Sequence, residues 1–195
     1  MQTFETARLV MRLLGHDDEA LYCACYIDPV LMQHIGEPLT HDAALRSFAA
    51  ALKSTTAIPI RRYTWVMQEK QSQSKIGLLA LVFSQDQDQE QDISAELGHI
   101  VLTKFQNQGL TVEAITGMLD IAFHTTRLAT VFVNHKSKNN AVTRVVKKLG
   151  FLPDTVEPGD ISNCRWALPR SHWQSTKASR DLKSFAASAQ AAVQK

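Results

Sequence analysis

The most constraining feature of the sequence is a strand, a helix and a second strand packed into residues 94–133. Residues 94–102 (SAELGHIVL) have the composition of a strand, as do residues 129–133. Between them, residues 109–126 carry apolar side chains at the spacing of one helix face. Two strands joined through such a helix are parallel neighbours with a right-handed connection. The pattern therefore predicts a βαβ unit within a larger sheet.

The segments on either side of this unit predict an antiparallel remainder. Before it we expect helices at 17–26, from Asp28-Pro29 onward and at 41–53, and strands at 8–14, 63–68 and 76–83. Asp17 and Asp18 are expected to cap the first of these helices. After the unit come a helix at 139–149, ended by Gly150, and strands around Phe151 and at 164–168. The expected fold is α+β: a mixed, mostly antiparallel sheet of about seven strands, helices on both faces, and one parallel βαβ crossover.

The length of 195 residues fits a single domain, which we place at residues 1–173. Residues 174–195 form a predicted helical tail that packs on the domain or on a second subunit, so a monomer and a homodimer are both open. A membrane-surface helix is disfavoured because its apolar face is mostly alanine. The acidic segment SQDQDQEQDIS (residues 84–94) predicts a solvated loop; a metal-binding loop is the alternative, but the segment lacks the glycine and ligand spacing of a calcium site.

Composition narrows the function classes. A net charge of +2 without a basic stripe argues against nucleic-acid binding. No stretch has the length of a signal peptide or the roughly 20 apolar residues of a membrane helix, so we expect a cytoplasmic protein without membrane contact. The three cysteines, Cys23, Cys25 and Cys164, contain no CxxC pair and are expected to be free thiols. The histidines have no metal-ligand spacing, so no metal site is expected.

The polar segment at the start of the βαβ helix is a candidate anion site. It runs LTKFQNQGLTVEA (residues 102–114), and Gly109 opens the helix. The first N–H groups of a helix lack acceptors within it, and with the helix dipole they favour an anion such as pyrophosphate. The segment is neither a P-loop nor a GxGxxG fingerprint. On these residues alone, a simple turn is the alternative interpretation.

Five segments in order give the chain a family resemblance. They are TARLVMRLL, DPVLMQHIGEP, AELGHIVLTKFQNQGLTVEA, NNAVTRVVKKLGF and ALPRSHW. Over residues 6–173 the chain resembles the GNAT superfamily of N-acetyltransferases, and within it the RimJ/RimL-like branch. The resemblance implies a GNAT-like fold, acetyl-CoA as cosubstrate, and transfer of the acetyl group to an amine.

The resemblance also implies where acetyl-CoA is held. Residues 106–111 (QNQGLT) stand where the family has Gln/Arg-x-x-Gly-x-Gly/Ala, a loop whose N–H groups hold the pyrophosphate. Thr111 replaces a smaller residue there; its hydroxyl adds a donor or its bulk narrows the site. The strand end would pair with pantetheine as an added strand does. The implied cofactor-binding residues are Leu102, Thr103, Gln106, Gln108, Gly109, Leu110, Thr111 and Asn140.

Two residues receive catalytic roles from the resemblance. Glu96 is the implied base that deprotonates the amine, and Thr143, near the thioester sulfur, orients the leaving group. His99 is the rival base because an unperturbed imidazole titrates near pH 6.5, and alternation places it on the opposite face of the sheet. Read without the resemblance, Asn140 is a polar residue at a helix start and Thr143 a hydroxyl that bonds its own backbone.

The function implied is an acetyl-CoA-dependent N-acetyltransferase that uses direct attack in a ternary complex. The acceptor is a primary amine: the α-amine of a protein N-terminus, such as that of a ribosomal protein, or a small molecule. Arg61 and Arg62 hint at an acidic acceptor, with ordinary surface residues as the alternative. The second function hypothesis is a catalytically weak or inactive module that binds acyl-CoA or a partner on the same fold. Thr111 and the absence of a tyrosine from residues 139–149 motivate it.

Overall fold

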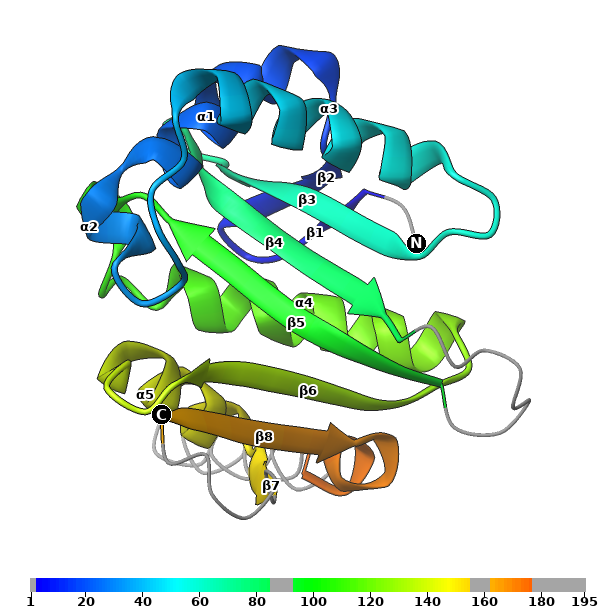
Figure 1. The fold of residues 1–195 in the computed structure, drawn as a ribbon. Helices are drawn as coiled ribbons and strands as arrows, with labels where there is room; N and C mark the ends of the chain where they lie inside the picture. Colours follow the sequence, from blue (N-terminus) through cyan, green and yellow to red (C-terminus); the bar gives the residue numbers. More distant parts are fainter. Residues whose placement is uncertain (1–2, 85–92, 155–161, 177–195) are drawn as a thin grey trace, which may run out of the picture.

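The computed structural model describes residues 3–84, 93–154 and 162–176. One sheet runs through the molecule in the order β1-β2-β3-β4-β5-β6-β8-β7 (Figure 1). Its pairs are antiparallel except β5 with β6, which are parallel and joined through a helix. The strands are β1 (Phe4–Glu5), β2 (Leu9–Leu13), β3 (Arg62–Glu69), β4 (Lys75–Phe83), β5 (Ile93–Val101), β6 (Leu128–Lys136), β7 (Leu152–Asp154) and β8 (Asn163–Pro169).

The predicted α+β class is confirmed, including the single βαβ crossover. The additional strand relative to the prediction is β1, a two-residue segment that pairs with β2. The labelled helices are α1 (Glu19–Ile27), α2 (Pro29–Met32), α3 (His41–Thr56), α4 (Leu110–Thr125) and α5 (Asn140–Leu149), with 3-10 turns η1 (His16–Asp18) and η2 (Thr103–Phe105). Residues 170–176, which follow β8, are also helical. The acidic segment 85–92 and the tail from residue 177 lie outside the described residues, so the predictions for them, and the division at residue 173, stay predictions.

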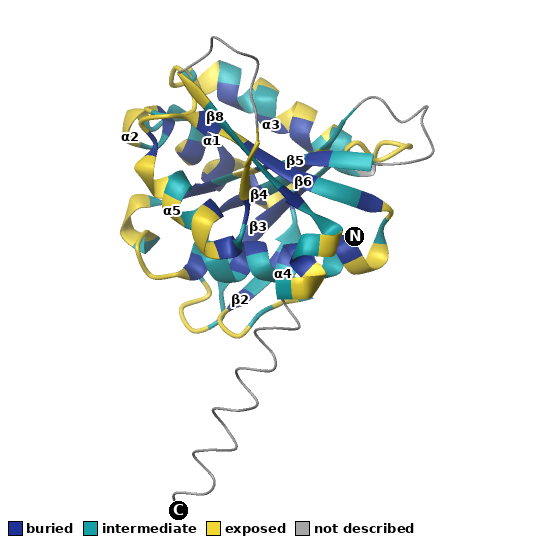
Figure 2. Cartoon of the chain, turned by 90° about the horizontal axis from the view of Figure 1, so that it is seen from below, coloured by how far each residue is buried: buried dark blue, intermediate teal, exposed yellow. Residues whose placement is uncertain are grey.

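The sheet lies between two layers of helices, which Figure 2 shows from below. On one face α4 and α5 cover the larger apolar cluster, to which Leu79, Leu97 and Val101 of the sheet contribute. On the other face α1, α2 and α3 cover a smaller cluster that includes Val66, Leu78 and Ile100. Alternation along β5 thus directs neighbouring side chains to different helix layers. Within the described ranges no helix has the length and hydropathy needed to cross a membrane.

Two of the predicted helix boundaries depend on capping contacts that the structure contains. The Asp28 carboxylate accepts a hydrogen bond from the Val30 backbone N–H at 2.7 Å at the start of α2. Gly150 ends α5 with a left-handed φ of 84°, and its N–H donates to the Lys147 and Val146 carbonyls. Both arrangements satisfy backbone groups that a helix end leaves open.

Asp18 occupies the N-cap position of α1, as predicted, but its carboxylate does not cap the helix. Its side chain makes no capping hydrogen bond, because the buried carboxylate is bound elsewhere. Arg12 holds both oxygens at 2.6 Å, Lys75 Nζ lies 2.7 Å from Oδ1, and the Gly15 N–H donates at 2.9 Å. Burial opposes the charged form, but these contacts outweigh it and lower the pKa of Asp18 to about 2. The cluster ties β2, η1 and β4 together.

Replacing Asp18 by asparagine is expected to destabilise the protein by about 3 kcal/mol, because two partly buried cations lose their anion. The folded-state pKa of about 2 lies below the unfolded value near 3.8, so the stabilisation is complete above about pH 4 and is lost as the pH falls toward 2. Urea unfolding at several pH values measures both effects. The wild type should lose more stability than Asp18→Asn over this window, and equal slopes would contradict the assignment.

Candidate functional site

A cavity of about 790 Å³ opens where β5 and β6 separate. Their parallel pairing ends at Glu96 and Phe132, although the strands continue to Val101 and Lys136. The lining includes residues from both faces of the sheet, so the cavity passes through this opening. An unpaired strand edge presents N–H and C=O groups to an extended ligand. The size lies within the range of small-molecule sites.

The N-terminus of α4 forms one end of the cavity. Gly109 precedes the helix with a φ of 76°, a left-handed conformation that glycine adopts without a steric penalty. Its carbonyl accepts the Glu113 N–H at 3.1 Å, which closes the first helical turn. The N–H groups of the residues between them have no acceptor within the helix. The helix that the sequence predicts after Gly109 is therefore present, and its N-terminus faces the cavity.

The loop before α4 is fastened at two points. The Gln106 amide donates to the Val101 carbonyl at 2.9 Å, which joins the loop to the end of β5. The Arg8 guanidinium donates to the Gln108 carbonyl at 3.0 Å. These contacts hold the backbone in place before any ligand binds, and a preorganised site loses less entropy on binding.

Glu113 lies in the first turn of α4, but it is outside the cavity lining and its carboxylate is bound by Thr6 and Arg8. It accepts hydrogen bonds from the Thr6 hydroxyl at 2.6 Å, from the Arg8 N–H at 2.7 Å and from Arg8 Nε at 2.6 Å. Burial raises the pKa of this carboxyl, and the hydrogen bonds from Thr6 and Arg8 lower it further than burial raises it. The negative charge is thus balanced by Arg8, which leaves the loop suited to an anion.

Glu96 and His99 line the cavity from opposite faces of the sheet, as alternation predicts. Glu96 shares its face with Ile100 and hence with α1 to α3, and Asn134 Nδ2 donates to its Oε1 at 3.1 Å. His99 shares its face with Leu97 and Val101, under α4 and α5. Burial lowers the pKa of His99 to about 4, so its ring is neutral near pH 7. Both side chains therefore line the cavity that an amine would enter.

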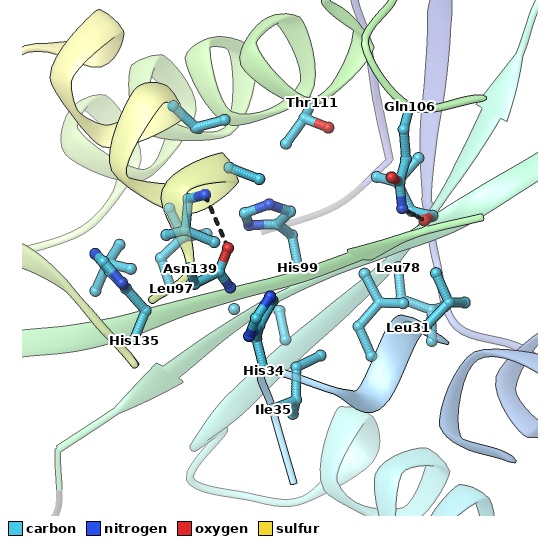
Figure 3. A pocket seen from close by; sticks show the side chains of 18 of the residues that line it. Leu31, His34, Ile35, Leu78, Leu97, His99, Gln106, Thr111, His135 and Asn139 are labelled. Carbon is cyan, nitrogen blue, oxygen red and sulfur yellow. Dashed lines mark hydrogen bonds between the residues drawn. The ribbon is translucent and has the colours of Figure 1, made fainter. Parts of the chain in front are cut away.

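The start of α5 places Asn139, one residue earlier than predicted, in the cavity wall. Asn139 is buried and its Oδ1 accepts the Val142 N–H at 3.2 Å, a hydrogen bond drawn in Figure 3. Asn140 is exposed and lies outside the residues that line the cavity. Thr143 also lies outside this lining, and its hydroxyl donates to the Asn139 carbonyl at 3.2 Å. This is the backbone contact that the sequence left open as the alternative.

The other predicted cofactor residues divide into two groups. Five line the cavity, and these are Gln106, Gln108, Gly109, Leu110 and Thr111. Figure 3 shows Thr111 across the cavity from His99. Leu102 and Thr103 do not belong to the lining. The Leu102 N–H donates to the Ile76 carbonyl at 2.9 Å, and Thr103 begins the exposed turn η2.

Sequence reasoning missed a further cavity residue, His135. It is buried, and its Nδ1 lies 2.9 Å from the Lys136 carbonyl, which can only accept, so Nδ1 is the donor in this contact. Within the described chain, Nε2 is one of two buried side-chain polar atoms without a hydrogen-bond partner. A buried ring nitrogen without a partner in a cavity wall fits a ligand that supplies a polar group. No local sequence signal identifies it, because its position depends on where β5 and β6 separate.

The charges around the cavity suit a phosphate-bearing cofactor. Three cations line the cavity on the side of α5: Lys136 at the end of β6, and Arg144 and Lys148 on α5 itself. The N-terminus of α4 lines another wall of the cavity. The unpaired edge of β5, the unpartnered His135 Nε2 and these cations together fit the pantetheine and phosphates of coenzyme A. The described residues contain no group of three or more His, Cys, Asp or Glu side chains that could hold a metal ion.

Comparison with known proteins identifies the family of this fold. Residues 8–152 match the family model of the acetyltransferase (GNAT) domain. No curated protein matches the sequence.

Solved structures with the same fold include three with described ligands or substrates. A nucleotide-linked sugar GNAT, FdhC, has a TM-score of 0.73 at 15% identity, covering 92% of this chain and 96% of its own. Spermidine N-acetyltransferase from Vibrio cholerae, in complex with CoA and spermine, has a TM-score of 0.71 at 18% identity, covering 86% and 99%. The ribosomal α-N-protein acetyltransferase RimL, in complex with coenzyme A, has a TM-score of 0.71 at 11% identity, covering 86% and 98%.

Proposed function

Because the chain belongs to the GNAT acetyltransferase family, we propose that it transfers acetyl from acetyl-CoA to a primary amine by direct attack in a ternary complex. The observation that carries the proposal is the opening between β5 and β6, with Glu96 at one face and the α4 N-terminus at its end. Acetyl-CoA would lie along the unpaired edge of β5, with its pyrophosphate on the loop at Gly109.

The reaction needs a proton acceptor and a donor to the developing oxyanion. Glu96 takes the proton from the attacking amine, which enters from the face of α1 to α3. A β5 backbone N–H beyond Glu96 donates to the oxyanion of the tetrahedral intermediate. The carbon–sulfur bond then breaks and the thiolate of coenzyme A takes up a proton from water, while Glu96 returns to water the proton that it removed from the amine. Cys23 and Cys25 lie in α1, outside the cavity lining, which supports transfer without an acyl-enzyme.

The acceptor belongs to one of the classes that fold neighbours use. These are the α-amine of a protein N-terminus, as in the RimJ/RimL-like branch, and a small-molecule amine. The competing hypothesis is a catalytically weak module that binds acyl-CoA. In α4, Thr111 lines the cavity and motivates that hypothesis. Consumption of the thioester with any member of an amine panel, dependent on Glu96, would remove it. We also propose a cytoplasmic location, as composition predicts.

The Gly109→Trp variant is expected to lose acetyl-CoA binding in calorimetry, because the indole fills the loop and the left-handed φ of 76° disfavours a side chain. Wild-type binding should be in the micromolar range. Gln73→Trp is the matched control, since Gln73 is exposed, has a φ of 56° and lies outside the cavity lining. No binding by the wild type, or equal binding by Gly109→Trp, would overturn the cofactor site.

A further inference from the structure

The acceptor side of the cavity has a charged residue of opposite sign on each of two strands. Arg62 on β3 pairs with Val82 on β4, and Val82 pairs with Glu96 on β5. Directly opposed residues in a sheet share a face, so the three side chains form one row. With strands about 4.8 Å apart, the Arg62 and Glu96 backbones are about 10 Å apart across this row. All three residues line the cavity.

The next row leaves room for a ligand beside the row that carries these charges. It consists of Thr64, Ala80 and Gly98, paired in the same way. A Cβ built on Gly98 meets no atom within 4 Å, so the space above this position is open. Beyond this floor, Leu31, His34 and Ile35 line the cavity from α2 and the turn after it (Figure 3). The acceptor side is thus a shallow chamber with small residues at its base.

Arg62 is held toward this chamber, whereas Arg61 is not. Its Nε donates to the Thr64 hydroxyl at 3.1 Å, and its side chain is half-buried. The Tyr26 hydroxyl lies beside the guanidinium, and burial raises the pKa of Tyr26 to about 12, so the hydroxyl stays neutral. Arg61 is exposed and lies outside the lining. A planar guanidinium fixed in this way suits the paired oxygens of a carboxylate or phosphate.

The charge balance disfavours a polycationic acceptor. Among the lining residues that the structure describes, Glu96 is the only carboxylate, and Asn134 already donates to it. A diamine that places one nitrogen at Glu96 would bring its second ammonium toward Arg62. Two like charges in a partly dry chamber repel each other. An acceptor with an anionic group at that end gains the opposite interaction.

We propose that the acceptor is a primary amine carrying a carboxylate or a phosphate a few carbons away, with the amine at Glu96 and the anion on Arg62. This inference rests on the proposed acetyltransferase function. It names the chemical class of the acceptor, and it assigns Arg62 as a specificity residue.

A matched set of amines tests the inference by release of coenzyme A thiol. The set is δ-aminovalerate, its neutral amide, cadaverine and aminobutylphosphonate, which share a chain length and differ in the distal group. For the wild type, kcat/KM should be at least tenfold higher for an anionic member than for the amide, and lowest for cadaverine. The better of the two anionic members identifies the carboxylate or the phosphate as the recognised group.

Arg62→Gln should remove this preference, lowering kcat/KM about tenfold or more for the anionic amines and leaving the rate with the amide within about twofold. Arg61→Gln is the control and should behave as the wild type. Transfer without anionic preference, or a preference that survives in Arg62→Gln, overturns the inference and leaves the proposed function standing. No thioester consumption with this set and with a broad panel of peptide and small-molecule amines overturns both.

Discussion

Replacing Glu96 by glutamine is expected to lower kcat about a hundredfold or more and to leave acetyl-CoA affinity unchanged. Glutamine keeps the size of the side chain, and its carbonyl can still accept the Asn134 amide that now lies 3.1 Å from Oε1. What it loses is the ability to take a proton from the amine. Steady-state assays of coenzyme A release measure kcat, and calorimetry measures the affinity for acetyl-CoA.

The pH profile of this variant distinguishes a base from a merely structural residue. A lysine-like amine deprotonates in solution near pH 10.4, so the deficit of Glu96→Gln should shrink as the pH rises toward that value. His99→Gln is the companion variant, because His99 lines the same cavity from the other face. If His99→Gln lost the activity and Glu96→Gln kept it, the base would be His99, whose lowered pKa of about 4 leaves it neutral at pH 7.

The parts of the fold that depend on local pattern were predictable. The apolar periodicity of residues 109–126 became α4 (Leu110–Thr125), and Gly150 ended α5 in the left-handed conformation. Capping and periodicity involve residues a few positions apart, so one sequence contains the needed information. The βαβ crossover followed for the same reason, since strand, helix and strand are consecutive.

The parts that depend on distant partners were not predictable from the sequence. Asp18 has the residue type and position of a helix cap, but its carboxylate forms ion pairs with Arg12 and with Lys75, which is distant in the sequence. The sequence alone does not distinguish the roles of Arg61 and Arg62, because they are adjacent and of the same type. The register of β3 places Arg62 on the same face of the sheet as Glu96. A shift of one residue in strand register exchanges the two faces.

The candidate site shows the same division at the level of single residues. The family resemblance implied a cofactor contact by Asn140 at the start of α5, whereas in the structure Asn139, the N-cap residue, lines the cavity and Asn140 does not. His135 and Asn134 enter the site because β5 and β6 separate after Glu96 and Phe132. Separation of two strands is a property of the whole sheet, and no local motif in β6 marks it.

Gly77 on β4 and Gly98 on β5 differ in the space around them, so their alanine variants should differ in stability. Gly77→Ala is expected to destabilise the protein severely, and Gly98→Ala is not. A Cβ on Gly77 would collide with the Ile100 carbonyl oxygen and lie 2.9 Å from Val101 Cα, so β4 and β5 would have to move apart. Overpacking of this kind costs about 3 kcal/mol or more, which lowers the Tm of a protein this size by about 6–12 °C.

Gly98→Ala places its methyl group in open space above the chamber floor, where a Cβ meets nothing within 4 Å. Its Tm should match or slightly exceed that of the wild type, since alanine loses less backbone entropy than glycine on folding. The methyl group should instead raise the KM for the acceptor, because it occupies volume next to Glu96. Thermal unfolding of both variants measures the contrast. Similar Tm losses in the two would contradict the close approach of β4 and β5 at Gly77, while a large loss in Gly77→Ala alone would agree with the lack of space at Gly77 and the open space at Gly98.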